Sequence, residues 1–586
     1  MFSVLWKLGW FFKKYWKRYS IAVSFLIAAS IIDVIPPRLI GKAIDDIHIG
    51  TMTADRIVEY VLMLGGLMTA GYLLTYVWMY QLFGGAFLIE RIMRSRFMGH
   101  LLKMTPTFYE KNRTGDLMAR ATNDLKAISL TAGFGILTLV DSSIFMMVIV
   151  FMMGFFISWK LTFAAMLPLP LMAFAMNRYG KIIHERFTRA QDAFGDMNDQ
   201  VLESIAGIRS IRAYVQEDAD QKHFHDMTED VYDKNIAVAR VDALFEPTIK
   251  VLVGISYLIG IGYGAYLVFH NTITLGELVS FNVYLGMLIW PMFAIGELIN
   301  VMQRGNASLD RVNETLAYKA DVEDDPQPVH IDKPSSITFE KVTFQYPSST
   351  VRNLENVSFE IHEGQTLGIV GKTGSGKTTL IKQLLREYPT GAGNILINGI
   401  PLKKVPLESI QSWIGYVPQE QILFSKSVKE NIRFGKTGCS DEEIQHVLEM
   451  ADFAKDIDSL PEGLETLVGE KGVALSGGQK QRISIARALI AEPEILILDD
   501  ALSAVDAKTE AKIISHIREE RAGKTTIIAT HRLSAVEHAD WIVVLENGRI
   551  IEEGGHGELL HREGWYKEQF DRQQLEESLT GSGGVL

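Results

Sequence analysis

Apolar residues are concentrated in the first half of this 586-residue chain, where they form six long runs. Each run is near or above the roughly 18–20 residues that a helix needs to cross a bilayer. The runs lie at about 20–44, 61–89, 128–158, 161–177, 251–269 and 278–296. Because hydrogen bonds within a helix satisfy the backbone in lipid, we predict an all-α transmembrane domain of six long helices over 20–320.

Basic residues mark one side of the predicted membrane domain. Arg and Lys recur between spans two and three and between spans four and five, whereas 45–55 and 270–277 contain neither. Cytoplasmic connections carry the excess of basic residues. We therefore predict a multi-pass protein of the plasma membrane with its N-terminus and C-terminal half in the cytoplasm. Helical periodicity over 178–203 and 220–243 extends these spans into the cytoplasm.

The first 19 residues mix tryptophan and phenylalanine with lysine and arginine. This composition predicts an elbow helix over 1–19 that lies in the membrane interface. The alternative is a plain cytosolic lead-in to the first span. The short apolar core and small-residue cleavage site of a signal peptide are both missing from this stretch.

The composition changes after residue 320. Acidic residues and proline cluster over 321–336, which predicts a linker. Residues 337–570 have the mixture expected of an α/β domain, and we expect the polar tail over 571–586 to be disordered from 575 onward. The net charge of −12 argues against a general nucleic-acid-binding protein. The single cysteine, Cys439, cannot form a disulfide within the chain and is interpreted as an inert loop residue.

A glycine-rich loop follows the apolar run 367–370, and a helical pattern follows the loop. Strand, Gly-x-x-x-x-Gly-Lys-Thr and helix in this order are typical of a P-loop. Its glycines let backbone N–H groups surround phosphate oxygens, its lysine reaches the β- and γ-phosphates, and its threonine binds Mg²⁺. The predicted phosphate-binding residues are Gly371, Thr373, Gly374, Ser375, Gly376, Lys377, Thr378 and Thr379.

Further motifs surround the P-loop along the chain. Tyr346 follows a strand-like segment and could stack on a base, and Gln419 ends another strand, where it could orient water or Mg²⁺. The buried strand 495–498 precedes Asp499 and Asp500, of which the first fits an Mg²⁺-binding carboxylate. His531 ends a later strand and could touch the γ-phosphate.

A second phosphate-binding surface is predicted at Leu475-Ser-Gly-Gly-Gln, which opens a helix. With six spans, a P-loop and this LSGGQ, essentially the whole chain resembles an ABC exporter half-transporter. The resemblance implies that ATP and Mg²⁺ bind, that two half-transporters pair, and that LSGGQ touches the ATP of the opposite subunit through Ser476, Gly477, Gly478 and Gln479. It also implies a D-loop with Ser503 and Asp506, coupling helices at Tyr109–Asp116 and Ile208–Tyr214, and coupled ATP hydrolysis.

Asp500 departs from the family pattern, in which a glutamate usually activates the attacking water. Aspartate is shorter by roughly one C–C bond, about 1–1.5 Å, and misplacement by about 1 Å can cost roughly 100-fold in rate. We therefore expect a slow ATP site on this chain and a different partner that carries the glutamate. This pattern resembles the aspartate-bearing subunit of heterodimeric bacterial multidrug exporters. The alternative is a working homodimer that tolerates Asp500.

Met, aromatic and acidic residues within the spans are candidates for a substrate cavity, because Met-rich surfaces adapt to varied apolar ligands and acids in lipid are often functional. The candidates are Asp141, Tyr284, Met287, Trp290 and Phe293. For each, ordinary packing is the alternative, and for Asp141 it is a hydrogen bond between helices. We expect amphipathic, often cationic substrates. A lipid or peptide exporter and a regulatory ATP-binding membrane subunit are the alternatives.

Overall fold

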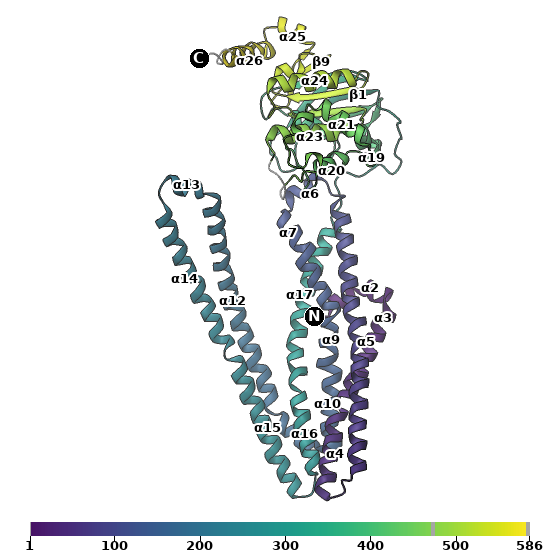
Figure 1. Ribbon diagram of the computed structural model, residues 1–586, viewed down its shortest axis with the longest axis vertical. Coiled ribbons are helices and arrows are strands. Elements are labelled where there is room, and N and C mark those ends of the chain that lie inside the picture. The colour runs from purple at the N-terminus through teal and green to yellow at the C-terminus, as the bar shows by residue number, and fades with distance from the viewer. Residues whose placement is uncertain (1, 470–474, 582–586) are drawn as a thin grey trace. The chain divides into compact units, whose positions relative to one another are not determined.

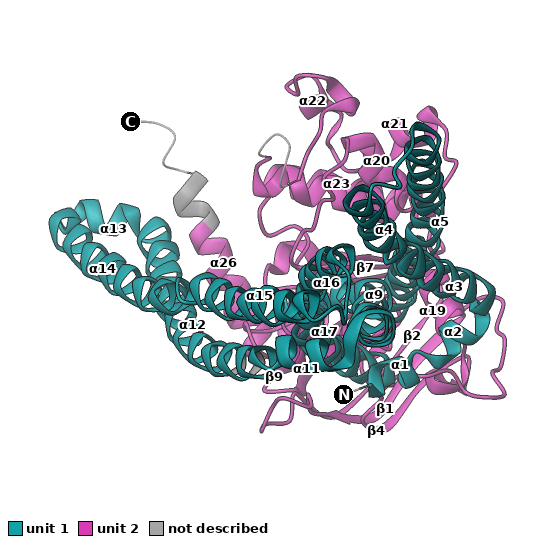
Figure 2. Cartoon of the chain, turned by 90° about the horizontal axis from the view of Figure 1, so that it is seen from below, with its two compact units in different colours: residues 1–101, 115–318 teal, residues 102–114, 319–586 magenta. Residues whose placement is uncertain are grey.

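The computed structural model describes residues 2–469 and 475–581 (Figure 1). The chain divides into two compact units (Figure 2). The first contains Met1–Leu101 and Gly115–Tyr318, and the second contains Leu102–Thr114 and Lys319–Leu586. Segment Leu102–Thr114 therefore packs with the C-terminal half, although it lies within the predicted transmembrane domain in the sequence.

Helices joined by short connections make up the described residues of the first unit. Its helices are α1 (Ser3–Lys7), α2 (Gly9–Lys14), α3 (Trp16–Asp33), α4 (Ile35–Ile49), α5 (Ala54–Leu101), α7 (Thr114–Ala119), η1 (Arg120–Asp124), α8 (Leu125–Ala132), α9 (Phe134–Val140), η2 (Asp141–Phe145), α10 (Met146–Met153), η3 (Gly154–Ser158), α11 (Trp159–Met166), α12 (Pro168–Ala206), α13 (Ile208–Ala213), α14 (Glu217–Asp242), α15 (Phe245–Phe269), α16 (Leu275–Met287) and α17 (Ile289–Ala317). Segments η1, η2 and η3 are π-helical.

Five helical stretches of the described chain are long and apolar enough to cross a membrane, instead of the six predicted. The difference arises because predicted spans three and four lie in one 93-residue stretch, Thr114–Ala206. Ser158 interrupts this stretch with an extended backbone, at φ −164° and ψ 121°, and its side chain accepts a hydrogen bond from the N–H of Leu161. The apolar sequence resumes within two residues, so the boundary between the two spans is a single capped break.

The predicted elbow over 1–19 is two short helices and the start of α3, with breaks at Leu8 and Tyr15, instead of one helix. Val4, Leu8 and Phe11 are fully buried, and Lys7 forms an ion pair with Asp310 of α17. The tryptophans of this segment are exposed at Trp6, Trp10 and Trp16. The elbow thus packs one face, including Phe11, on protein and leaves its tryptophans exposed. Its placement in the membrane interface stays a prediction.

Helices α4 and α16 approach closely at two glycines. A Cβ atom on Gly276 would lie 1.9 Å from the carbonyl oxygen of Gly41, and one on Gly41 would lie 2.1 Å from Ser280 Oγ. Small residues allow membrane helices to approach and form hydrogen bonds with each other. Here Ser280 Oγ donates to the carbonyl of Pro37 at 2.8 Å, and Tyr284 Oη donates to that of Val34 at 2.6 Å.

The second unit contains two sheets. One is antiparallel, in the order β2-β1-β4-β5, and the other has the order β10-β9-β3-β8-β7-β6. In the larger sheet β9, β3, β8, β7 and β6 are parallel and β10 is antiparallel to β9. The strands are β1 (Ser336–Phe344), β2 (Leu354–His362), β3 (Thr366–Val370), β4 (Ala392–Ile397), β5 (Ile400–Pro401), β6 (Ile414–Val417), β7 (Ile495–Asp499), β8 (Thr525–Thr530), β9 (Trp541–Glu546) and β10 (Arg549–Gly554).

Helices pack around these sheets, and the central strands β3, β7 and β8 are largely buried, as expected for parallel strands covered on both faces. The helices of this unit are α6 (Pro106–Lys111), α18 (Lys377–Leu384), η4 (Leu402–Lys404), α19 (Leu407–Trp413), α20 (Val428–Arg433), α21 (Asp441–Met450), α22 (Ala454–Ile457), η5 (Gly463–Glu465), α23 (Gly477–Leu489), α24 (Ala507–Glu520), η6 (Leu533–Val536), α25 (His556–His561) and α26 (Trp565–Gly581).

The C-terminal tail differs from its prediction. Helix α26 continues to Gly581, so the expectation of disorder from 575 onward is wrong for 575–581. Helix-forming Leu and Glu occur in this segment, and Arg572 pairs with Glu576 one turn later. Residues 582–586 lie outside the described part of the chain.

The contact between α4 and α16 generates a stability prediction. We expect Gly276→Ala to lower the melting temperature of the purified protein, because the new methyl group must displace the backbone of Gly41. Such overpacking costs about 1–3 kcal/mol. Gly262→Ala in α15 is the matched control, since a Cβ atom there meets nothing within 4 Å. Equal melting temperatures for both variants, measured in the same detergent, would contradict the close packing.

Candidate ATP-binding site

The P-loop connects the end of β3 to the start of α18, and two of its glycines are required by sterics. Gly371 has a φ of 152°, and a Cβ atom there would lie 2.2 Å from the carbonyl oxygen of Leu545. Gly376 has a φ of 109°, and its Cβ atom would lie 2.7 Å from the carbonyl oxygen of Asn353. Only glycine fits these two positions without moving the backbone.

The remaining P-loop groups suit a phosphate chain. Lys377 Nζ donates to the carbonyl oxygens of Gly371 at 2.8 Å and Lys372 at 3.1 Å, so its side chain curls back over the loop. Burial lowers the pKa of Lys377, which the neighbouring carboxylates Asp500 and Asp499 partly counter. Ser375 Oγ is buried and has no hydrogen-bond partner among the described residues. A buried hydroxyl without a partner is costly, and a phosphate oxygen would satisfy it.

A hydroxyl and a carboxylate come together beside the loop. Thr378 Oγ1 donates to Asp499 Oδ1 at 3.1 Å, and Tyr416 Oη donates to Asp499 Oδ2 at 3.4 Å. Burial raises the pKa of Asp499. No group of three or more His, Cys, Asp or Glu that could hold a metal lies in 2–469 or 475–581. Thr378 and Asp499 offer one hydroxyl and one carboxylate, a donor set that fits Mg²⁺ bound mainly by substrate phosphates and water.

Asp500 lies between two residues predicted to act with it. Its Oδ1 is 2.9 Å from His531 Nδ1, and its Oδ2 accepts a hydrogen bond from Gln419 Nε2 at 3.5 Å. Burial alone would raise the pKa of Asp500, but His531 and the cations Lys377 and Arg532 outweigh burial and lower it. The carboxyl is consequently ionised at neutral pH. The amide of Gln419 faces Asp500, whereas the predicted Mg²⁺ ligands Thr378 and Asp499 bond to each other.

Tyr346 belongs to a chain of aromatic and polar contacts within the second unit. Its hydroxyl donates to Thr379 Oγ1 at 3.1 Å, and its ring meets that of Tyr388 edge-on, with centroids 4.9 Å apart. Tyr388 Oη donates to Glu110 Oε1 of α6 at 2.5 Å, and Ser348 Oγ donates to Glu110 Oε2 at 3.2 Å. Burial and the Glu110 carboxylate raise the pKa of Tyr388, so its hydroxyl keeps its proton. Sequence reasoning missed Tyr388, which no local motif marks.

The signature residues form the start of α23. Ser476 and Gln479 make a capping box: Ser476 Oγ accepts from the N–H of Gln479 at 3.2 Å, and Gln479 Oε1 accepts from the N–H of Ser476 at 3.0 Å. Gly477 and Gly478 occupy the first turn of α23, where backbone N–H groups are free for an anion. The segment 470–474, immediately before the motif, lies outside the described residues.

The predicted D-loop is held by two residues that no sequence motif marks. Gln481 binds Ser503 Oγ and the N–H of Ala504 through its amide, at 3.1 and 3.0 Å. Arg532 donates to the carbonyl oxygens of Ser503 at 3.0 Å and Val505 at 3.1 Å. The D-loop residue Asp506 ends the loop by capping α24, since its Oδ1 accepts from the N–H of Thr509 at 3.0 Å.

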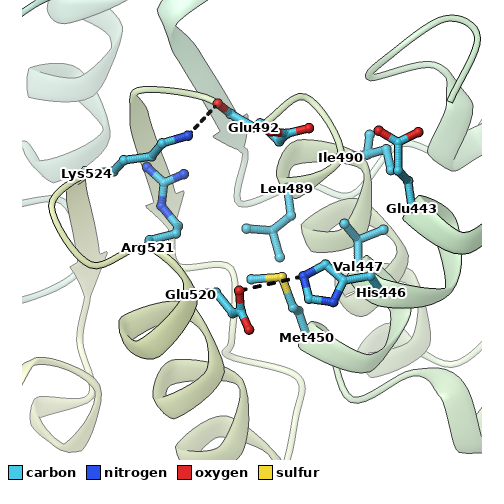
Figure 3. Close-up of a pocket in the computed structure, with 10 residues that line it drawn as sticks. All are labelled: Glu443, His446, Val447, Met450, Leu489, Ile490, Glu492, Glu520, Arg521 and Lys524. Carbon is cyan, nitrogen blue, oxygen red and sulfur yellow. Dashed lines mark hydrogen bonds and ion pairs between the residues drawn. The ribbon is translucent and has the colours of Figure 1, made fainter.

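A second hollow of about 260 Å³ lies between α21 and the C-terminal ends of α23 and α24 (Figure 3). Apolar side chains such as Val447 and Leu489 meet charged ones there, and His446 Nε2 lies 3.8 Å from Glu520 Oε2. None of the predicted ATP-binding residues lines this hollow. It is therefore separate from the P-loop site.

The candidate cavity residues of the first unit differ in their surroundings. Trp290 Nε1 donates to Asp141 Oδ2 at 2.9 Å, which is the inter-helix hydrogen bond considered as an alternative for Asp141. Tyr284 is 1% exposed and bonded to α4, and Met287 is partly buried. Trp290 and Phe293 remain partly open, at 49% and 37% exposed. The structure thus brings Asp141 and Trp290 together and leaves two aromatic faces accessible.

Comparison with known proteins identifies both parts of the chain. The family model of the ABC transporter transmembrane region matches residues 19–292, and that of the ABC transporter matches 354–503. The chain is 64% identical to the probable multidrug resistance ABC transporter ATP-binding/permease protein YheI of Bacillus subtilis. This match covers 100% of both chains. It is 42% identical to the multidrug resistance-like ATP-binding protein MdlA of Escherichia coli, covering 98% of this chain and 97% of the relative.

A solved structure of a bacterial Atm1-family ABC exporter with ATP bound is also similar, with a TM-score of 0.78 and 26% identity. The match covers 95% of this chain and 99% of the other. The predicted fold class, a helical transmembrane domain followed by an ATP-binding α/β domain, is confirmed by these matches. The chain belongs to the ABC transporters, as a half-transporter with its membrane domain fused to its ATP-binding domain.

Proposed function

We propose that this ATP-driven exporter is one subunit of a heterodimeric multidrug efflux pump, with a slow ATP site on its own Walker motifs. The whole-length likeness to proteins named for multidrug resistance supports the substrate class, amphipathic and often cationic compounds. The basic connections support a plasma-membrane protein whose N-terminus and ATP-binding domain are cytoplasmic. The contacts of Asp500 support the slow site.

The observation that carries this proposal is the position of the Asp500 carboxylate. Its pKa is lowered, so the base form is present at neutral pH and protonation does not explain a slow site. The site is slow because the Asp500 carboxylate does not extend far enough toward the attacking water. Its shorter side chain is already bonded to His531 at 2.9 Å. A base held about 1 Å away from its best position loses roughly 100-fold in rate.

The intact LSGGQ sequence supports a role for this chain in a second ATP site, on the partner subunit. Ser476, Gly477, Gly478 and Gln479 keep the residue types of LSGGQ, so they can complete an ATP site on a partner that carries the glutamate. A homodimer would combine two slow sites. A regulatory subunit that seldom hydrolyses ATP is the alternative from another functional class, and the retained His531 and Gln419 argue against it.

In this mechanism the chain's own residues bind and orient ATP. Tyr346 stacks on the base, and Lys377 and the P-loop N–H groups bind the phosphates. Thr378 and Asp499 would hold Mg²⁺, which would supply positive charge to the phosphates. ATP binding favours the closed pair of ATP-binding domains, which shifts the membrane helices from inward- to outward-facing. Hydrolysis at the faster site resets the transporter.

The contacts of α6 suggest how the two parts communicate. This helix lies in the chain between α5 and α7, yet Glu110 is bonded to Tyr388, whose ring touches Tyr346. A base stacked on Tyr346 would restrict that ring and therefore Tyr388. We propose that this pathway links nucleotide binding to movement of the long helices through the first coupling region, Tyr109–Asp116.

The slow-site proposal predicts a gain of function. We expect the purified chain alone to hydrolyse ATP very slowly and Asp500→Glu to raise its steady-state rate by up to about 100-fold, because the longer side chain restores the reach of the base. The measurement is ATPase activity in nanodiscs. Asp500→Asn is the control, since it keeps the length and removes the base, and it should show no gain.

Two outcomes would contradict parts of this proposal. Brisk, drug-stimulated hydrolysis by the native chain alone would identify a self-sufficient homodimer. Slow hydrolysis by both the native chain and Asp500→Glu, with unchanged melting temperature, would show that reach at position 500 is not what limits the rate. The melting temperature is needed because Asp500 has a φ of 50°, a conformation that glutamate tolerates less well.

The coupling proposal predicts that Tyr388→Phe lowers the ratio of drug-stimulated to basal ATPase activity in the assembled transporter. The variant keeps the ring against Tyr346 and removes only the hydroxyl that donates to Glu110. Ser348→Ala is the matched control, because it removes the other, more exposed hydrogen bond to Glu110. Equal ratios in Tyr388→Phe and the native protein would exclude this pathway.

The proposed substrate class, amphipathic and often cationic compounds, predicts ATP-dependent transport of such a compound. In inverted vesicles that contain both subunits, we expect ATP-dependent uptake of a cationic fluorescent dye, and none when Lys377→Ala removes the phosphate-binding amine. Vesicles that bind ATP but accumulate no tracer, across many amphipathic compounds, would favour the regulatory alternative.

A further inference from the structure

A pocket of about 230 Å³ in the membrane domain is lined by residues of α4, α10, η3 and α16. Figure 1 labels α4 and α16 at the lower end of the first unit, where α4 ends and α16 begins. Arg38 and Lys42 line the pocket from successive turns of α4, so they share one helix face. Met152, Phe156 and Ile157 supply apolar walls.

The two cations of this pocket lie within a membrane-spanning stretch, Trp16–Ile49. Asp45 lines the same pocket. Arg38 precedes it by seven residues, which is roughly 10 Å along the helix axis. Within the described chain neither Arg38 nor Lys42 forms a side-chain hydrogen bond or an ion pair. Charged groups in such segments are costly and usually pair with opposite charge or serve binding.

The acids of the pocket are already committed to the start of α16. Asp45 Oδ2 accepts from Thr274 Oγ1 at 2.6 Å, and its Oδ1 accepts from the N–H of Gly276 at 2.7 Å. Glu277 Oε2 accepts from the N–H of Thr274 at 2.9 Å as part of a capping box. The Asp45 bonds hold α16 to α4, and the Glu277 bond caps α16 itself. Both acids therefore have hydrogen-bond partners other than Arg38 and Lys42.

The Arg38 guanidinium stacks on an aromatic ring instead of pairing with an acid. Its central carbon lies 3.8 Å from the centroid of the Phe156 ring. A stacked guanidinium keeps its N–H edge free, and that edge matches a carboxylate or phosphate in a two-point hydrogen bond. Phe156 therefore orients Arg38 without neutralising it, and Lys42 adds a second positive charge one turn away.

We propose that this pocket binds the anionic head group, a phosphate or carboxylate, of an amphiphile whose apolar part lies along Met152 and Ile157. The volume of about 230 Å³ suits a head group with the start of a chain, since whole drug-sized ligands occupy roughly 300–1,000 Å³. Under the proposed orientation the pocket lies at the outer-leaflet end of the helices. This site is independent of the ATP-site asymmetry and differs in charge preference from the cationic substrates proposed above.

The test titrates phosphatidylglycerol into the purified full-length protein in an uncharged detergent and follows the melting temperature and lipid retention by native mass spectrometry. We expect stabilisation by phosphatidylglycerol and not by phosphatidylcholine with the same acyl chains. Arg38→Gln and Lys42→Gln should each weaken the apparent affinity by roughly tenfold or more, because each removes a charge-assisted contact.

Lys160→Gln is the matched control, because Lys160 lies near the same end of the helices but does not line the pocket. It should bind phosphatidylglycerol as the native protein does. Equal losses in all three variants would indicate general charge attraction and overturn the proposal. Equal stabilisation by the zwitterionic lipid, or none by either lipid, would overturn it as well.

A second experiment distinguishes a lipid that the protein transports from a lipid that stays bound to it. In proteoliposomes containing fluorescent phosphatidylglycerol, ATP-dependent movement of the label between leaflets that Arg38→Gln abolishes identifies a transported lipid. Binding that depends on Arg38 without ATP-dependent movement identifies a resident membrane lipid. Both results require the site. Because the binding measurement uses no ATP, it stands even if the pump proposal fails.

Discussion

Parallel pairing of four strands is the constraint on which the ATP site depends. Strands β6, β7, β8 and β3 lie side by side and run in one direction, so their carboxyl ends meet at one edge of the sheet. Ligands of open α/β sheets bind at that edge. Gln419, Asp500 and His531 follow three of these ends, Asp499 is the last residue of β7, and the P-loop follows the fourth end. Residues up to 160 positions apart in sequence thus meet because hydrogen bonds between strands align them.

The motifs of this site could be found from sequence because local geometry demands particular residue types. Gly371 and Gly376 are examples, since a side chain at either would strike a backbone carbonyl. Gln481, Arg532 and Tyr388 could not be found in this way. Each acts through partners distant in sequence, such as Ser503 for Arg532, and many sequences place Gln, Arg or Tyr at such positions without these contacts.

The membrane half was predictable for a different reason. Hydropathy alone locates apolar stretches, since lipid requires each helix to satisfy its own backbone. It locates their boundaries less well, because one extended residue, Ser158, suffices to separate two spans. Hydropathy also says nothing about which helices touch. The contact of α4 with α16 rests on Gly41 and Gly276, and their pairing could be read only from the three-dimensional arrangement.

The backbone at Asp500 has a consequence for how this site could change over evolutionary time. Aspartate and glutamate codons differ by a single base, so return to the family's usual residue is one mutation away. Asp500, however, has a left-handed backbone with a φ of 50°. Aspartate is several times more common there than most residues. A change to glutamate would therefore meet a conformational cost that the genetic code does not reveal, and this cost would favour keeping aspartate at position 500.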